Sequence, residues 1–197
     1  MAKRLFDLIV ASLALLLLAP LLVGLALVVK LDSPGPAFFR QVRVGRHGAP
    51  FRIHKFRTMQ AGAEGLALTV GSDPRITRSG AWLRRTRLDE LPQLLDVLRG
   101  SMSLVGPRPE VPRYVAHYPA ALRARVLAVR PGITDPSSLA FIDEAALLAV
   151  AVDPEREYIE RILPAKLQSA AAYADSASLA SDILVLWRTV GLLLRRR

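Results

Sequence analysis

The 197-residue chain contains no cysteine and only three histidines. Without cysteine it can form no disulfide bond, no catalytic thiolate and no zinc site built on cysteine. Three histidines give little material for a histidine-based metal centre. A magnesium site made of carboxylate oxygens stays open, because magnesium takes hard oxygen ligands and is often held by one or two carboxylates together with substrate phosphates.

Acidic and aromatic residues are also scarce. The chain has 17 Asp and Glu against 27 Lys and Arg, a formal net charge of +10, and aromatic residues make up 6% of it. This charge favours an anionic partner, which can be nucleic acid, an anionic membrane surface or a phosphorylated substrate. The basic segments carry few interleaved aromatic residues on which bases could stack, which counts against nucleic acid.

An uncharged apolar run covers residues 8–29. A helix of this length, at about 1.5 Å per residue, matches a hydrocarbon core roughly 30 Å thick. Pro20 lies in the middle, where proline kinks or breaks a helix, and basic residues flank both ends, namely Lys3, Arg4 and Lys30. Two interpretations stay open: a kinked spanning helix, and a segment that enters the membrane and turns back. A cleaved signal peptide is disfavoured, because no convincing small-residue cleavage motif leads into a mature start.

Two strand-like segments, residues 37–44 and 50–56, follow a Pro-Gly-rich break at 33–36 and flank turn residues at 45–48. They predict a β-hairpin. Its basic side chains could line a phosphate site, but for most of them a solvated strand face is the commoner cause of such alternation. These side chains are Arg40, Arg43, Arg52, Lys55 and Arg57.

The rest of the chain is predicted to be mostly helical, after an irregular loop over residues 60–80. Helices are expected at residues 114–129, 143–150 and 154–174, and a last helix, capped by Ser181 and Asp182, runs to the C-terminus. With Trp187 and three terminal arginines, the last helix can lie at a membrane interface or pack in the core.

The adjacent carboxylates Asp89 and Glu90 form the first candidate site. Proline is accepted in the first turn of a helix but costs about 3 kcal/mol in its interior. Pro92 therefore indicates that the helix carrying the apolar positions 91, 94, 95 and 98 begins near Asp89 and ends at Gly100. Asp89 can then be a plain N-cap. Alternatively, the helix N-terminus and the arginines at 84, 85 and 87 bind phosphate, and a carboxylate there binds Mg²⁺ or attacks phosphorus.

Two rigid basic loops follow this helix. Arg108 lies between Pro107 and Pro109, whose rings fix the local backbone, and residues 130–136 contain an Arg-Pro-Gly turn. A rigidly held arginine suits a phosphate or a nucleotide, although a structural loop with an exposed arginine is the alternative. We interpret both loops as walls of one site.

Four segments together carry a family resemblance. They are residues 55–59 (KFRTM), 88–93 (LDELPQ), 102–109 (MSLVGPRP) and 130–134 (RPGIT). In their order and spacing the chain resembles the bacterial sugar transferase family, the monotopic polyprenol-phosphate phosphoglycosyl transferases, along nearly its whole length. One such motif alone would be weak, but the four together are specific.

The resemblance implies a two-step reaction. A UDP-sugar gives its phosphosugar to Asp89 and releases UMP, and undecaprenyl phosphate then takes the phosphosugar from the aspartate. Glu90 assists through Mg²⁺, which Asp89 and Glu90 would hold, or as a base for the acceptor phosphate. Arg84 corresponds to an arginine near the phosphates, and Arg108 to one associated with nucleotide binding. Lesser candidates for substrate binding are Lys55, Arg57 and Thr58.

The resemblance also implies a fold and a location. The expected class is α+β, mostly helical, with a re-entrant membrane helix-break-helix over residues 1–32, broken at Pro20. Residues 33–197 then form a membrane-associated catalytic domain with a small β-hairpin and amphipathic helices at the membrane interface. This domain would face the cytoplasm at the bacterial inner membrane, and homo-oligomerisation stays open. The alternative outside the family is a non-enzymatic, membrane-anchored basic module that binds nucleic acid or anionic lipid.

Overall fold

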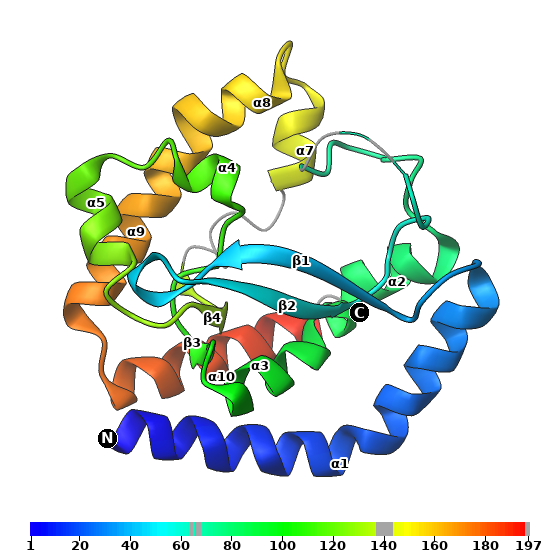
Figure 1. Ribbon diagram of the computed structural model, residues 1–197, viewed down its shortest axis with the longest axis horizontal. Coiled ribbons are helices and arrows are strands. Elements are labelled where there is room, and N and C mark those ends of the chain that lie inside the picture. The colour runs from blue at the N-terminus through cyan, green and yellow to red at the C-terminus, as the bar shows by residue number, and fades with distance from the viewer. Residues whose placement is uncertain (64, 66–67, 137–143, 196–197) are drawn as a thin grey trace.

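The computed structural model describes residues 1–63, 65, 68–136 and 144–195. One long helix, α1 (Ala2–Asp32), runs along the edge of a body made of a β-hairpin and shorter helices (Figure 1). The chain stays helical through Pro20, and Figure 1 shows α1 bent part-way along its length. The expected helix-break-helix is therefore a bent helix in this structure, because a proline can kink a helix without ending it.

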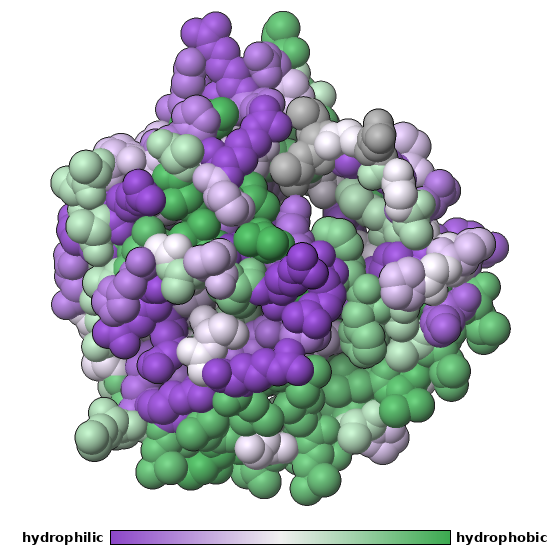
Figure 2. All heavy atoms as spheres, in the orientation of Figure 1, coloured by the Kyte–Doolittle hydropathy of each residue, from purple (hydrophilic) through white to green (hydrophobic). Residues whose placement is uncertain are grey.

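Only one side of α1 packs against the body. Ala11, Leu25 and Val29 are buried, whereas the apolar side chains on the other side are exposed and form the apolar band along the lower edge of Figure 2. Among the described residues, α1 is the one helix long and apolar enough to cross a membrane, by length and composition. Its most exposed apolar side chains include Leu5, Leu13, Leu16, Leu17, Val23 and Leu31.

Both ends of α1 are fixed to the same body. Near its start, the Arg4 guanidinium donates to the carbonyl oxygens of Val97 (2.7 Å) and Leu98 (3.2 Å). At its other end, Asp32 Oδ2 accepts from the backbone N–H and the hydroxyl of Ser79, at 3.0 and 2.8 Å. The helix therefore begins and ends on one structural unit.

The predicted hairpin is confirmed. It consists of β1 (Phe38–Val44) and β2 (Pro50–Phe56), which pair antiparallel from Phe38↔Phe56 to Val44↔Pro50, with the 3-10 turn η1 (Arg46–Gly48) between them. The Phe38 and Phe56 rings stack at the open end, with centroids 5.3 Å apart. This cross-strand pair adds to the pairing at the end of the ladder that lies farthest from the turn.

Short helices and one small parallel strand pair complete the α+β body, which is mostly helical as expected. After the hairpin come α2 (Arg78–Thr86), the 3-10 helix η2 (Leu88–Gln93) and α3 (Leu94–Arg99), and β3 (Ser103–Val105) pairs in parallel with β4 (Gly132–Thr134). The other described helices are α4 (Pro112–Val115), α5 (Ala120–Val126), α7 (Glu144–Ala149), α8 (Pro154–Glu157), the π-helical turn η3 (Tyr158–Ile162), α9 (Leu163–Ser176) and α10 (Leu179–Arg195).

Three predicted boundaries change. The helix expected over residues 114–129 is two helices, α4 and α5, because Pro119 lacks the backbone N–H needed to continue α4. α10 begins at Leu179, before the expected cap at 181–182, and the Ser178 hydroxyl accepts from the N–H of Ser181 (3.1 Å). α2 begins at Arg78, inside the stretch predicted as a loop. Residue 143, the expected start of α7, lies outside the described residues.

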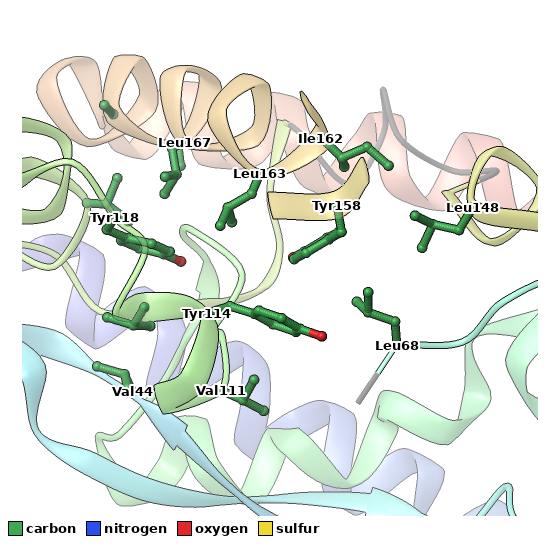
Figure 3. Packing of buried hydrophobic residues seen from close by; sticks show 14 residues of the cluster. Val44, Leu68, Val111, Tyr114, Tyr118, Leu148, Tyr158, Ile162, Leu163 and Leu167 are labelled. Carbon is green, nitrogen blue, oxygen red and sulfur yellow. The ribbon is translucent and has the colours of Figure 1, made fainter. Parts of the chain in front are cut away.

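Buried apolar side chains form three clusters around the hairpin. The largest joins α4 and α5 to η3 and α9 and contains Tyr114 and Tyr158 (Figure 3). The second joins the first half of α1 to α3, α10 and Ile53 of β2. The third joins the second half of α1 to Phe56 of β2 and Leu83 of α2. β2 therefore contributes to two clusters and connects both halves of α1 to the body.

Candidate active site

The acidic pair lies on η2, between α2 and α3. Arg87 ends α2 in the left-handed conformation (φ 59°), and its carbonyl accepts from the N–H of Glu90 (3.3 Å). Asp89 and Glu90 fall in the first turn of η2, near the helix start that Pro92 predicted, but the segment is a 3-10 helix up to Gln93 and α-helical only from Leu94. The capping interpretation of Asp89 is wrong, because Arg87 occupies the N-cap position and no side-chain capping bond forms.

Glu90 is buried between two cations. Its Oε1 accepts from Lys55 Nζ (2.6 Å) and from Arg108 Nη2, and its Oε2 accepts from Arg108 Nη1 (3.3 Å). Burial, the largest single influence, would raise the pKa of Glu90, but the charges of Arg108 and Lys55 and the hydrogen bond from Arg108 together outweigh it. The pKa of Glu90 therefore lies well below its usual range, and the side chain is a carboxylate at neutral pH.

Asp89 is buried beside Glu90 in a different environment. Its Oδ1 has no hydrogen-bond partner among the described residues. Burial is the main cause that raises the pKa of Asp89, and the negative charge of Glu90 adds to it, while Lys55, Arg84 and Arg108 act in the opposite direction. A buried carboxylate oxygen without a donor is costly, so this atom is an acceptor that a metal or a reacting group could satisfy.

Arg84 is placed near the pair by Thr58. Its Nε donates to Thr58 Oγ1 and its Nη1 to Thr69 Oγ1, both at 2.8 Å. The start of α2 lies close against Thr58. The Thr58 carbonyl accepts from the N–H of Thr77 (3.1 Å), and a Cβ added at Gly80 would overlap the same carbonyl. Burial lowers the pKa of Arg84, and the charge of Asp89 opposes this most strongly. Arg84 is therefore a partly buried cation close to Asp89.

Arg57, in contrast, is not brought to the carboxylates. Its guanidinium donates to four carbonyl oxygens at the end of α1 and in the loop that follows, where cations suit the negative end of the helix dipole. Its acceptors are the carbonyls of Val29 (3.2 Å), Ser33 (2.8 Å), Pro34 (2.6 Å) and Pro36 (2.7 Å).

Of the seven predicted site residues, Asp89, Glu90, Lys55, Arg84 and Arg108 lie together and Thr58 supports Arg84.

The two rigid loops lie side by side, as expected for walls of one site. The N–H of Gly106 donates to the Thr134 carbonyl, and the N–H of Gly132 donates to the Pro107 carbonyl, both at 3.0 Å. A Cβ on Gly106 would overlap the carbonyl oxygen of Arg130, so the two backbones require glycine where they meet. This close approach fixes the base of the loop that presents Arg108 to Glu90.

A model of the bacterial sugar transferase family matches residues 1–196 of this chain. The chain belongs to that family. The match covers α1, the hairpin and the whole site described above, and it confirms the family resemblance read from the four sequence motifs.

Several bacterial sugar transferases are similar to this chain. A Caulobacter vibrioides protein named UDP-glucose:undecaprenyl-phosphate glucose-1-phosphate transferase is 51% identical over 137 residues, which are 67% of this chain and 51% of that protein. An Escherichia coli protein of the same name is 46% identical over 136 residues, 67% of this chain and 29% of that protein. An Aeromonas hydrophila protein named UDP-N-acetylgalactosamine-undecaprenyl-phosphate N-acetylgalactosaminephosphotransferase is 35% identical over 95% of this chain and 42% of its own length. The chain thus spans about half or less of each of these relatives.

The donor set of this sugar transferase fits a magnesium ion that brings its own phosphate and water ligands. The described residues contain no group of three or more His, Cys, Asp or Glu side chains arranged for a metal. Asp89 offers one unpaired buried oxygen, whereas both oxygens of Glu90 already accept from cations. Magnesium bound to a diphosphate needs only one or two protein carboxylates, so Asp89 fits as a ligand and Glu90 fits less well.

One residue of the site region could not be identified from the sequence. Arg43 was interpreted as part of a solvated strand face, but its guanidinium is buried and donates to the carbonyl of Pro109, next to Arg108, at 3.0 Å. No local pattern distinguishes Arg43 from the exposed Arg40 and Arg52. Its burial depends on a loop more than sixty residues farther along the chain.

Proposed function

We propose that this chain transfers a phosphosugar from a UDP-sugar to undecaprenyl phosphate and releases UMP, as the first membrane step of bacterial glycan assembly. Family membership and the names of the similar proteins support this proposal. The observation that carries it is Asp89: a buried carboxylate with an unpaired oxygen, whose pKa responds to the charges of Lys55, Arg84 and Arg108. Such a site suits a nucleophile that must approach a phosphate.

In the first proposed step, an oxygen of Asp89 attacks the sugar-linked phosphorus of the UDP-sugar. A bond forms from Asp89 to phosphorus, the bond from phosphorus to the bridging oxygen breaks, and UMP leaves with that oxygen. Repulsion between the carboxylate and the diphosphate opposes this approach. The nearby cations Lys55, Arg84 and Arg108 reduce that repulsion and stabilise the charge on the equatorial oxygens.

In the second proposed step, an oxygen of undecaprenyl phosphate attacks the phosphorus carried by Asp89. The bond from phosphorus to the aspartate breaks, which regenerates the carboxylate and yields a polyprenyl diphosphosugar. One nucleophile serves both substrates in turn, so both must reach the same atom. Asp89 Oδ1 accepts no hydrogen bond from the described residues, so it is open to each substrate in turn.

Glu90 acts in this proposal by organising charge. A base for the acceptor phosphate needs a pKa near the working pH, whereas the cations beside Glu90 keep its pKa far lower. Its ion pairs with Lys55 and Arg108 hold two cations near Asp89. Magnesium, when bound through Asp89 and the donor diphosphate, would supply further charge neutralisation.

We also propose that α1 enters one leaflet of the bacterial inner membrane and returns, with both ends and the remaining chain on the cytoplasmic side. At about 1.5 Å per residue, the 31 residues of α1 span roughly 46 Å, enough to cross a bilayer. Both ends are nevertheless fixed to one body through Arg4 and Asp32, and the exposed side of the helix is apolar. A bent helix lying partly in the membrane satisfies both observations.

The activity is tested by UMP release from a panel of UDP-sugars with undecaprenyl phosphate and Mg²⁺ in detergent or nanodiscs. Wild-type protein should release UMP with at least one donor, and Asp89→Asn should abolish release. Asp175→Asn is the matched control, because Asp175 pairs with Arg125 on the surface, and it should keep wild-type activity. Absence of UMP with every donor would refute the proposed reaction, and an active Asp89→Asn variant would remove Asp89 as the nucleophile.

The topology is tested with single cysteines, since the chain has none of its own. Ala2→Cys and Pro34→Cys place a thiol beyond each end of the apolar run, and Ala124→Cys on α5 marks the globular body; all three positions are exposed. A membrane-impermeant maleimide should label all three from the same side in oriented vesicles. Labelling of positions 2 and 34 from opposite sides would exclude the re-entrant arrangement.

A further inference from the structure

A largely buried polar cluster packs against the two residues that follow Arg108. Arg43 on β1 donates from Nη1 to the Pro109 carbonyl (3.0 Å) and lies 3.6 Å from Glu110 Oε2. The hydroxyl of Tyr158 donates to Glu110 Oε1 (2.6 Å). The two residues that follow Arg108 are therefore each held by a side chain from a distant element.

The cluster is built at some cost, which indicates a specific role. Arg43 Nε is buried without a hydrogen-bond partner among the described residues, and Tyr158 belongs to a π-helical turn, a rare feature that is frequent at functional sites. Figure 3 shows Tyr158 facing Tyr114 between the α8–α9 layer and the hairpin, and the two ring centroids are 4.9 Å apart. The π-helical turn thus places the Tyr158 hydroxyl beside Glu110, while the Tyr158 ring belongs to the largest apolar cluster.

The cluster and the active site share the Arg108 loop. Arg108 reaches Glu90 on one side, while the N–H of Val44 on β1 donates to the Glu110 carbonyl (2.9 Å) on the other. Glu90 is the main cause that raises the pKa of Arg108, and the charge of Glu110 adds to it. A displacement of Pro109 or Glu110 would therefore move the Arg108 guanidinium relative to Glu90, because Pro109 directly follows Arg108 and Glu110 comes next.

We propose that Arg43, Glu110 and Tyr158 are positioning residues that hold Arg108 where it binds the anionic part of the nucleotide-sugar donor. This inference rests on the proposed function for its substrate, but the positioning itself is a property of the fold. Through Tyr158, η3 thereby contributes to donor binding. Arg43 acts through the backbone carbonyl of Pro109, and Tyr158 acts through the side-chain carboxylate of Glu110.

The test compares Tyr158→Phe with Tyr118→Phe. Both tyrosines are buried in the largest apolar cluster, but the Tyr158 hydroxyl donates to Glu110, whereas the Tyr118 hydroxyl makes no hydrogen bond to a described residue. Tyr158→Phe should raise the KM for the UDP-sugar about five- to tenfold with kcat within about twofold, the loss expected for one ordinary intramolecular hydrogen bond. Tyr118→Phe should leave both constants within about twofold.

Two further measurements separate positioning from general destabilisation. Hydrogen exchange of the peptide covering residues 105–111 should speed up in Tyr158→Phe and stay unchanged in Tyr118→Phe, whether or not the protein is active. Arg43→Lys, which keeps a cation beside Glu110, should raise KM less than Arg43→Met.

Each outcome has one meaning. Unchanged exchange in Tyr158→Phe overturns the positioning role, and so does an unchanged KM in an active protein or an equal effect of Tyr118→Phe. A wild-type protein that releases no UMP refutes the proposed function instead, and the exchange experiment then decides alone whether the cluster holds the Arg108 loop.

Discussion

Replacement of Glu90 by glutamine should destabilise the protein, although replacement of its neighbour Asp89 should not. In Glu90→Gln, the ammonium of Lys55 and the guanidinium of Arg108 lose their shared anion. Their side chains are only 17% and 29% exposed, so water replaces the carboxylate poorly. Removal of one partner from a buried ion pair costs about 3–5 kcal/mol, and the partial exposure of Arg108 places this case near 3 kcal/mol. For a chain of this size, that is a Tm lower by about 6–12 °C.

Asp89→Asn acts on the same turn with the opposite sign. The folded-state pKa of Asp89 is raised above its ordinary value of 3.8, chiefly by burial. The folded state therefore favours the protonated carboxyl of Asp89. Protonation of this carboxyl adds to the free energy of unfolding below pH 3.8, and this contribution is lost as the pH rises through the folded-state pKa. Asparagine is neutral at every pH and avoids this loss, so at pH 7.5 the variant should have a Tm equal to or above that of wild type. The difference should shrink as pH falls.

The assay is thermal unfolding in detergent at pH 7.5, followed by near-ultraviolet circular dichroism. Glu157→Gln is the control, because Glu157 pairs with Arg161, whose side chain is 77% exposed, and such pairs contribute at most about 1 kcal/mol. Its Tm should stay within about 3 °C of wild type. The reasoning fails if Glu90→Gln unfolds at the wild-type temperature, or if the two site variants lose the same stability.

Three further predictions concern the metal, the crossing of the loops and the end of α1. Chelation with EDTA should abolish UMP release, and added Mg²⁺ should restore it, since magnesium would screen the donor diphosphate. Gly106→Ala should lower Tm by about 5 °C or more, because its Cβ would overlap the Arg130 carbonyl, whereas Gly191→Ala on α10 meets no atom within 4 Å and should leave Tm unchanged or higher. Arg57→Leu removes the donor from four carbonyls, and should speed hydrogen exchange at residues 29–36 in the same detergent; unchanged exchange would contradict the anchoring role.

Local sequence signals predicted the elements whose geometry is decided locally. The hairpin follows from alternation and a glycine-rich turn, and the strands end within one residue of their predicted limits. Pro92 located the start of the helical turn that carries the carboxylates. The capping interpretation failed because Arg87 adopts the left-handed conformation that begins η2, a conformation disfavoured for arginine that no sequence rule selects.

The partners of the basic residues could not be predicted, because they depend on contacts between distant segments. Lys55 and Arg57 are two residues apart and would share a face of a continued strand. β2 ends at Phe56, however, and Arg57 turns to the end of α1 while Lys55 faces Glu90. Arg43 was assigned to solvent for the same reason, since its partner Glu110 lies in another loop. Charge patterns thus identified the residues available for a phosphate site but not which of them serve it.

The segment from Lys55 to Thr58 links the membrane helix to the acidic pair. Lys55 holds Glu90, Arg57 holds the last turn of α1, and Thr58 holds Arg84. These residues span at most about 10 Å of extended chain, so the distance from the end of α1 to the site is fixed by backbone geometry and not by a flexible linker. If α1 lies in one leaflet as proposed, Asp89 stays at a constant depth relative to the lipid headgroups. A polyprenyl phosphate, whose own phosphate is confined to that surface, then meets the nucleophile without a movement of the body against its membrane helix.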